Sequence, residues 1–221
     1  MLSEVCDLFP GRWLHTGGDE CPATSWQNCP ACRKRAADQG LYGVSNLQNW
    51  FTREIAEFLL TRHKVMIGWE EILNSELPPE TVVMVWKGDG MEVARQAFAR
   101  QHQIILSPGS FYYFDWKQLN SEDELGSFGV TTLSKTFSYD PLDISAAEKD
   151  RSLILGVQGN IWTERLTNEN QVSYMAFPRA LAIAETGWAK QRYTMPEFLK
   201  KVSMQSEFLK DKGINLCEKV E

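Results

Sequence analysis

The chain has no long hydrophobic run and no excess of basic residues. No apolar segment approaches the roughly 20 residues that a membrane-spanning helix needs, so we expect no membrane partner. The formal net charge of -6 argues against a nucleic-acid partner, because phosphate binding needs clustered Lys and Arg. The N-terminal segment also lacks the charged and apolar regions of a signal peptide, which leaves the compartment undetermined.

Cysteine is scarce and odd in number, at five residues. At least one thiol therefore has no partner within the chain. Cys29 and Cys32 have the spacing of a zinc knuckle, but no second pair or nearby His completes a set of four ligands. A thioredoxin-like role would need a different strand and helix context. We expect no metal site here, and either a local disulfide or plain thiols.

Aromatic residues are plentiful, at 11% of the chain with eight Trp. Several Trp lie beside acidic residues rather than inside aliphatic runs. Aromatic faces stack on sugar rings, so this placement suggests a carbohydrate ligand. The alternative is that the rings only fill the core.

Short apolar runs alternate with helical patterns, and no internal repeat is present. The runs are rich in branched residues, which is typical of fully buried parallel strands. We expect strands at residues 13–15, 65–68, 82–85, 104–106 and 153–157, and helices at residues 47–60, 91–100, 174–189 and 197–212, the last closed by Gly213. The alternation predicts one large α/β domain with right-handed crossovers.

Acidic or aromatic residues follow each expected strand. They are Asp19 and Glu20, then Trp69, Trp86, Tyr113 with Asp115, and Trp162 with Glu164. Catalytic and ligand-binding residues at the C-terminal ends of successive parallel strands are typical of a (β/α)8 barrel. A doubly wound sheet binds its ligand mainly at one switch point, so the pattern favours the barrel.

The segment His15-Thr16-Gly17-Gly18-Asp19-Glu20 is the most specific in the chain. Adjacent glycines allow a sharp turn at a strand end, and two carboxylates follow. A lone Asp-Glu pair more often complements a helix N-terminus. Here the pair follows a strand, and further acidic strand ends lie downstream, so we interpret it as catalytic.

These segments together resemble the family 20 glycoside hydrolases, the β-N-acetylhexosaminidases. The His15 to Glu20 segment is similar to the family signature after the fourth barrel strand. Four later segments are similar to the ends of the family's fifth to eighth barrel strands, namely Gly68-Trp69-Glu70-Glu71, Val85-Trp86-Lys87-Gly88, Tyr113-Phe114-Asp115 and Trp162-Thr163-Glu164. The segment from Pro178-Arg179-Ala180 through Glu185 and Trp188 is similar to the family's final barrel helix. The motifs occur in the family's order and cover nearly the whole chain.

The resemblance implies a retaining glycosidase that removes terminal N-acetylglucosamine or N-acetylgalactosamine from glycans, without a cofactor. The acetamido oxygen of the substrate would be the nucleophile and would form an oxazolinium intermediate. Glu20 would be the general acid and base. Asp19 would accept the acetamido N–H, and Tyr113 would donate to the acetamido oxygen.

The resemblance also implies a set of sugar-binding residues. Trp69, Trp86 and Trp162 would surround the sugar, and Asp115 and Glu164 would accept hydrogen bonds from its hydroxyls. For each Trp, core packing is the alternative.

Several further residues lie near the motifs. Tyr112 competes with Tyr113, and the spacing to Asp115 favours Tyr113. We expect His15 to be a buried hydrogen-bonding residue beneath the site. Supporting or structural roles are expected for Glu70, Glu71 and Glu185.

The family signature lies mid-barrel, whereas here it begins at residue 15. We therefore expect residues 1–221 to be the C-terminal portion of the catalytic barrel, about strands four to eight. The first strands and an N-terminal domain would be absent, together with a sugar-binding Arg and the Asp and His that accompany the acid. Open strand edges at residues 13–15 and 153–157 predict a homodimer, unless the loop at residues 118–143 covers them.

Other functions remain as alternatives. A truncated barrel that binds carbohydrate without turning it over is one of them. A chitinase-like hydrolase would carry a motif of alternating Asp residues, which the sequence lacks. Relatives in the family are often periplasmic, secreted or lysosomal, but the compartment of this chain stays undetermined.

Overall fold

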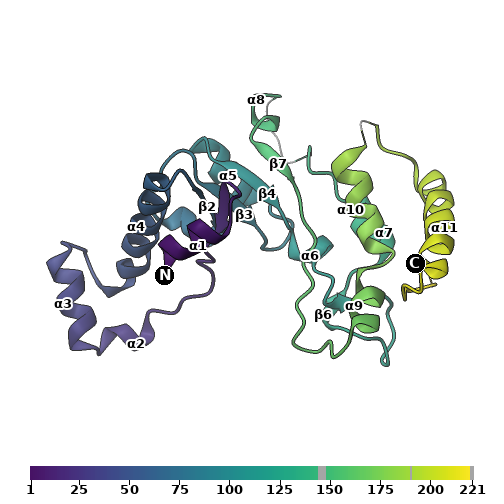
Figure 1. Cartoon of the computed structure of the whole chain (residues 1–221), viewed down its shortest axis with the longest axis horizontal. Coiled ribbons are helices and arrows are strands. Elements are labelled where there is room, and N and C mark those ends of the chain that lie inside the picture. Colours follow the sequence, from purple (N-terminus) through teal and green to yellow (C-terminus); the bar gives the residue numbers. More distant parts are fainter. Residues whose placement is uncertain (144–147, 190, 220–221) are drawn as a thin grey trace. The chain divides into compact units, whose positions relative to one another are not determined.

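The computed structural model describes residues 1–143, 148–189 and 191–219 (Figure 1). The helices are α1 (Leu2–Leu8), α2 (Thr24–Gln27), α3 (Pro30–Asp38), α4 (Leu47–Thr61), α5 (Met91–Ala99), α6 (Gly109–Tyr112), α7 (Leu133–Ser138), α8 (Glu148–Arg151), α9 (Glu169–Ala176), α10 (Arg179–Trp188) and α11 (Met195–Asp211), with short 3-10 helices η1 (Val44–Asn46) and η2 (Glu70–Asn74). The strands are β1 (Trp13–His15), β2 (Val65–Trp69), β3 (Val82–Val85), β4 (Gln103–Leu106), β5 (Trp116–Lys117), β6 (Ser127–Val130) and β7 (Ile154–Val157). Among these helices, none is long and apolar enough to cross a membrane.

The main sheet has five strands in the order β1-β2-β3-β4-β7. The strands β1 and β2 pair in parallel with Trp13 opposite Val65, and β2 and β3 pair in parallel with Ile67 opposite Val82. Helices lie in the connections between these strands, as in βαβ units. This arrangement confirms the expected α/β class.

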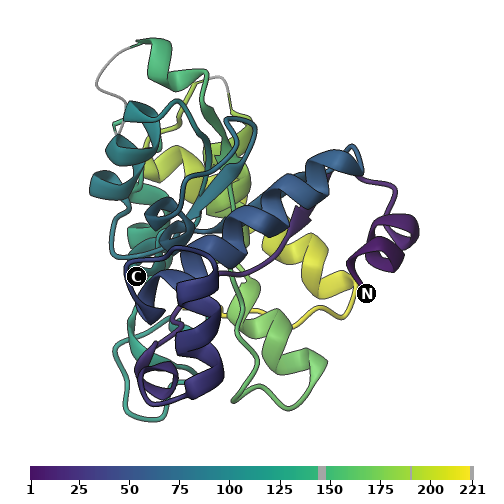
Figure 2. The ribbon, with the colours of Figure 1, turned by 90° about the vertical axis from the view of Figure 1, so that its left-hand side faces the viewer.

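The chain forms two compact units, residues 1–85 with 92–104 and residues 86–91 with 105–221. In the first unit, α4 packs against β2 (Figure 2). The helix presents Thr52, Ala56 and Leu59 to the interior because these residues recur at helical spacing. Strand β3 is buried along its whole length, as expected for a run of branched apolar residues in the middle of a sheet.

The two outer strands of the sheet are not fully buried, and the prediction that they would be was wrong. Trp13 in β1 is 51% exposed, and Leu155 in β7 is 41% exposed. The strands β1 and β7 lie at the two ends of the strand order, so within the described part of the chain each has a hydrogen-bonded neighbour strand on one side only. The expected dimerisation through these edges stays a prediction.

The second unit is built around a layer of helices α7, α10 and α11 (Figure 1). Its core contains Leu133, Phe137, Ala182, Phe198 and Val202. The rings of Phe137 and Phe198 stack with centroids 4.2 Å apart. This layer corrects one expectation, because the segment 118–143 is not a plain loop but contains β6 and α7.

Most expected helices match the structure closely, but the one predicted at residues 174–189 is two helices. Helix α9 ends at Ala176 and α10 begins at Arg179. Pro178 lies between them. In a continuous helix Pro178 would have no N–H to donate, and its ring would clash with the carbonyl of a residue in the preceding turn. At the other end of the chain, Thr194 and Glu197 form a capping box that starts α11, and Gly213 follows it with φ +73°.

Candidate active site

The turn that carries Asp19 and Glu20 follows β1 directly and is held at several points in the first unit. Gly17 and Gly18 have φ angles of +76° and +105°, and Glu20 itself has φ +44°. Both carboxylate residues are exposed. The main chain on either side is fixed, since Thr16 N–H donates to Ile67 O at 2.9 Å and Trp69 N–H donates to Gly17 O at 3.0 Å.

Two side chains from other elements complete the support of this turn. The amide of Gln48 in α4 donates to Gly18 O at 2.7 Å. Ile72 in η2 packs where Gly18 and Gly68 leave room, because a Cβ on Gly18 would lie 2.6 Å from the Ile72 Cγ2 atom and one on Gly68 would lie 2.7 Å from it. Close packing therefore requires glycine at both positions, and at Gly18 the backbone conformation requires it as well.

His15 differs from its expected burial. The residue is exposed, because it lies on the outer strand β1. It does make a hydrogen bond, since its Nδ1 accepts the Gly17 N–H at 3.2 Å. Its ring lies edge-on to Trp69 with centroids 5.0 Å apart, and loss of water around the imidazole lowers the pKa of His15, while the Asp19 carboxylate acts in the opposite direction.

Trp69 itself is only 8% exposed, so little of its ring is open to a ligand in this structure. The next residues, Glu70 and Glu71, open η2. Glu70 is buried and Glu71 is half-buried, and the supporting roles expected for them stay a prediction.

In the second unit, three of the expected site residues form an aromatic group. Tyr113 stacks with Trp86 at a centroid distance of 6.1 Å and an angle of 12°. Trp162 meets Tyr113 edge-on, also at 6.1 Å. Trp86 is half-buried and Trp162 is 40% exposed, so both have ring surface that solvent reaches. The cation of Lys87 lies 5.2 Å from the Trp86 ring centroid.

Main-chain hydrogen bonds explain how residues so far apart in the sequence come together. Phe114 N–H donates to Asn160 O at 2.7 Å, and Asn160 N–H donates to Tyr112 O at 2.9 Å. This pairing places the segment that leads to Trp162 beside Tyr113. Gly109 N–H donates to Trp86 O at 2.6 Å, which fixes Trp86 near the start of α6.

Tyr112 and Tyr113 lie in different surroundings, although they are adjacent. Tyr112 is fully buried and meets Tyr139 edge-on at 5.2 Å. Burial raises the pKa of Tyr112 to about 12. Tyr112 is therefore a core residue. Tyr113 is also buried, at 9% exposed, but it belongs to the aromatic group with Trp86 and Trp162.

Asp115 is 7% exposed, and its Oδ1 atom has no hydrogen-bond partner among the described residues. Burial raises the pKa of Asp115, and the charge of Glu164 adds to this, while the Arg179 guanidinium acts against it. Glu164 is exposed. The structure thus brings these two expected sugar-binding acids within electrostatic reach of each other.

Arg179, in the segment Pro178-Arg179-Ala180, had no role predicted from the sequence. It is fully buried and donates four hydrogen bonds to main-chain carbonyls. They go to Phe114 and Met175 at 2.7 Å, and to Trp116 and Thr131 at 2.9 Å. Burial lowers the pKa of Arg179 to about 9. The only sequence signal was its place in the motif at residues 178–180.

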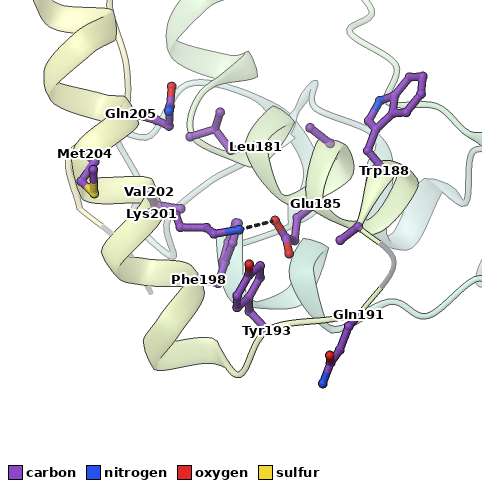
Figure 3. Close-up of a pocket in the computed structure, with 12 residues that line it drawn as sticks. Leu181, Glu185, Trp188, Gln191, Tyr193, Phe198, Lys201, Val202, Met204 and Gln205 are labelled. Atoms are coloured by element: carbon purple, nitrogen blue, oxygen red, sulfur yellow. Dashed lines mark hydrogen bonds and ion pairs between the residues drawn. The ribbon is translucent and has the colours of Figure 1, made fainter.

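A separate concave region of about 710 Å³ lies between α10 and α11 (Figure 3). Lys201 Nζ lies 3.4 Å from Glu185 Oε2, and also 3.4 Å from the Tyr193 ring centroid. The expected catalytic and sugar-binding residues are not among the described residues that line this region. Glu185 has the structural role of an ion-pair partner here.

All five cysteines are free thiols. In the described parts of the chain, no group of three or more His, Cys, Asp or Glu side chains is arranged to hold a metal ion.

Comparison with known proteins identifies the family. The model of "Glycosyl hydrolase family 20, catalytic domain" matches residues 1–191. This chain belongs to glycosyl hydrolase family 20. A β-hexosaminidase of Porphyromonas gingivalis is 35% identical over 190 residues, which are 85% of this chain and 24% of that protein. A β-hexosaminidase of Vibrio furnissii is 35% identical over 194 residues, which are 85% of this chain and 31% of that protein.

Solved structures of family 20 members agree with the fold. The exo-β-N-acetylglucosaminidase of Vibrio harveyi, solved with N-acetylglucosamine, has a TM-score of 0.89 at 30% identity over 98% of this chain and 34% of that chain. This similarity confirms the expected fold class, part of a (β/α)8 barrel. The chain spans a quarter to a third of the length of these family 20 relatives.

Proposed function

We propose that the protein is a β-N-acetylhexosaminidase that removes terminal N-acetylglucosamine or N-acetylgalactosamine from glycans. The observation that carries this proposal is the turn after β1. It presents two exposed carboxylates, Asp19 and Glu20, on a main chain fixed by β2, α4 and Ile72. Rigid support of this kind is what a group that must transfer a proton to a bound substrate needs.

In the first step, the carbonyl oxygen of the substrate's acetamido group attacks the anomeric carbon. Glu20 donates a proton to the departing glycosidic oxygen, so that the bond to the leaving group breaks. Asp19 accepts the acetamido N–H and offsets the positive charge that develops as the oxazolinium ring closes. Tyr113 donates its hydroxyl to the acetamido oxygen and orients it for attack.

In the second step, Glu20 removes a proton from water, which attacks the anomeric carbon and reopens the ring. Two inversions at this carbon give overall retention of configuration. No carboxylate of the protein forms a bond to the sugar, which separates this route from the usual pair of carboxylates in retaining enzymes.

The aromatic group and its acidic neighbours are proposed to bind the sugar. Trp86 and Trp162 have accessible ring surface beside Tyr113, which suits stacking on the sugar and on its acetamido methyl. Asp115 and Glu164 would accept hydrogen bonds from sugar hydroxyls. The buried Oδ1 atom of Asp115 can accept such a bond because it has no partner among the described residues. Trp69 would contribute from its position beside His15.

The experiment that tests the proposal compares two chromogenic substrates, the β-N-acetylglucosaminide and the plain β-glucoside. The proposed mechanism requires the 2-acetamido group, so only the first should be cleaved. The matched variant is Glu20→Gln, which should lower turnover by at least about a hundredfold. Binding of N-acetylglucosamine without cleavage of either substrate would instead favour the carbohydrate-binding alternative.

A further inference from the structure

Cys29 and Cys32 are arranged as a pair at the start of α3. Cys29 is the N-cap residue of this helix, and its Sγ accepts the Cys32 N–H at 3.4 Å. Pro30 occupies the first helical position, where its missing N–H costs no hydrogen bond. The two thiols therefore hold the positions that an N-cap residue and its partner three residues later hold in a capping box, where each side chain reaches the main chain of the other residue.

This geometry permits a direct bond between the two sulfur atoms. Residues three apart in a helical turn have Cα atoms about 5 Å apart, within the roughly 4.4–6.8 Å that a disulfide spans. Both residues are half-buried, so that small reagents reach them. The two thiols are free in this structure.

The two thiols differ in chemical character. The hydrogen bond from the Cys32 N–H, followed by that from the Cys32 thiol, lowers the pKa of Cys29. Donation to Cys29 raises the pKa of Cys32. A thiol with a lowered pKa attacks first in exchange reactions, and its neighbour then resolves the product.

The other cysteines lack this arrangement. Cys6 and Cys217 are buried, and Cys21 is exposed. The segment before Cys29 is also fixed to the first turn of α3, because Arg33 Nε donates to Gln27 O at 2.6 Å. The pair is thus already held in place before any bond forms.

We propose that Cys29 and Cys32 are a redox-active dithiol that a small-molecule disulfide oxidises to an intramolecular disulfide. The Cys29 thiolate attacks one sulfur of the small disulfide, which forms a mixed disulfide and releases one thiolate. The Cys32 thiolate then attacks the Cys29 sulfur, which releases the second thiolate. Two protein thiols are oxidised and one small disulfide is reduced to two thiols.

The bond would close the first turn of α3 covalently, in the segment that follows Glu20 along the chain. This inference does not depend on the proposed hydrolase activity, since it concerns thiol chemistry alone. It is therefore tested by a measurement that needs no substrate.

The test treats the reduced full chain with oxidised glutathione, alkylates the remaining thiols and weighs the peptides by mass spectrometry. In the wild type, the peptide with Cys29 and Cys32 should lose two hydrogen masses and carry no alkyl group. The matched control Cys21→Ser should give the same result. In Cys32→Ser, Cys29 should keep one glutathionyl group, because the resolving thiol is gone.

The reverse variant Cys29→Ser tests the order of attack. Its Cys32 should acquire glutathione severalfold more slowly than Cys29 does in Cys32→Ser, with circular dichroism confirming that both variants are folded. Equal rates would overturn the assignment of Cys29 as the attacking thiol. A wild-type chain in which both cysteines stay alkylated, or in which Cys29 pairs with Cys21, would overturn the proposal without reliance on any variant.

Discussion

The Arg179 guanidinium contacts both the main chain and the side chain of Phe114. The guanidinium donates to the Phe114 carbonyl oxygen at 2.7 Å, and its Cζ lies 4.7 Å from the centroid of the Phe114 ring. Phe114 stands between Tyr113 and Asp115 in the chain, so this contact fixes the segment that carries two proposed substrate-binding residues. Further hydrogen bonds from Arg179 to Trp116 and Thr131 fix the same segment to β5 and to the residue after β6.

Replacement of Arg179 by Met should destabilise the protein by about 3–5 kcal/mol, because buried carbonyl oxygens lose a charged donor that nothing replaces. Urea unfolding monitored by fluorescence measures this change. Arg95→Met is the matched control, since the side chain of Arg95 is 56% exposed, and it should change stability by less than about 0.5 kcal/mol. Equal unfolding midpoints for the two variants would contradict the role given to Arg179.

Gly18→Ala should destabilise the turn that carries the acids. The added Cβ would lie 2.6 Å from Ile72 Cγ2, and φ is +105°, so that we expect a loss of about 2–3 kcal/mol. Gly11→Ala is the control, because nothing lies within 4 Å of its added Cβ. Thermal unfolding of the two variants should differ clearly, and a Gly18→Ala variant as stable as Gly11→Ala would show that the turn is not tightly packed.

Tyr113→Phe and Tyr112→Phe form a matched pair for the proposed role of Tyr113. Removal of the Tyr113 hydroxyl should lower kcat/KM for a chromogenic N-acetylglucosaminide by about a hundredfold, the scale for one donor to a reacting oxygen. Tyr112→Phe should leave kcat/KM near the wild-type value, since Tyr112 lies in the core against Tyr139. The assignment fails if Tyr112→Phe has the larger effect.

Asp115 should make stability depend on pH in a defined direction. Burial raises the pKa of Asp115 above its ordinary value, so the folded state binds a proton that the unfolded state has released. The stability linked to this proton is fully present below the ordinary pKa of about 4 and is lost as pH rises through the raised pKa.

The variant Asp115→Asn cannot ionise, so it should not show this loss. We therefore expect the unfolding free energy of the wild type to fall relative to the variant as pH rises from about 4. Urea unfolding of both proteins over this pH range measures the difference. A difference that stays constant with pH would mean that Asp115 titrates normally.

The five strands of the main sheet were predictable from the sequence as short apolar runs followed by polar or aromatic residues. The strands β5 and β6 were not predicted, and β6 lies in a segment that we expected to be a loop. The exposure of Trp13 and Leu155 was not predictable, since apolar residues on an outer strand form the same sequence pattern as those on a central strand. The break between α9 and α10 could have been found from Pro178, but the helical spacing continues on both sides of it.

The candidate site residues were predictable only as separate strand ends. Spacing favoured Tyr113 over Tyr112. Both side chains are buried, but Tyr113 lies against Trp86 and Trp162, and its proposed role stays a prediction. The role of Arg179 could not be predicted, because its four partners are main-chain carbonyls. Such acceptors leave no pattern in the side chains of the sequence.

In the proposed mechanism, the acetamido group of the substrate is the nucleophile, and Asp19 and Tyr113 orient it. The most direct test is calorimetric measurement of the binding of a thiazoline analogue of N-acetylglucosamine, which mimics the cyclised intermediate, beside N-acetylglucosamine itself. We predict that the analogue binds at least about a hundredfold more tightly, as transition-state and intermediate mimics do. Equal affinity for the two ligands would contradict the account.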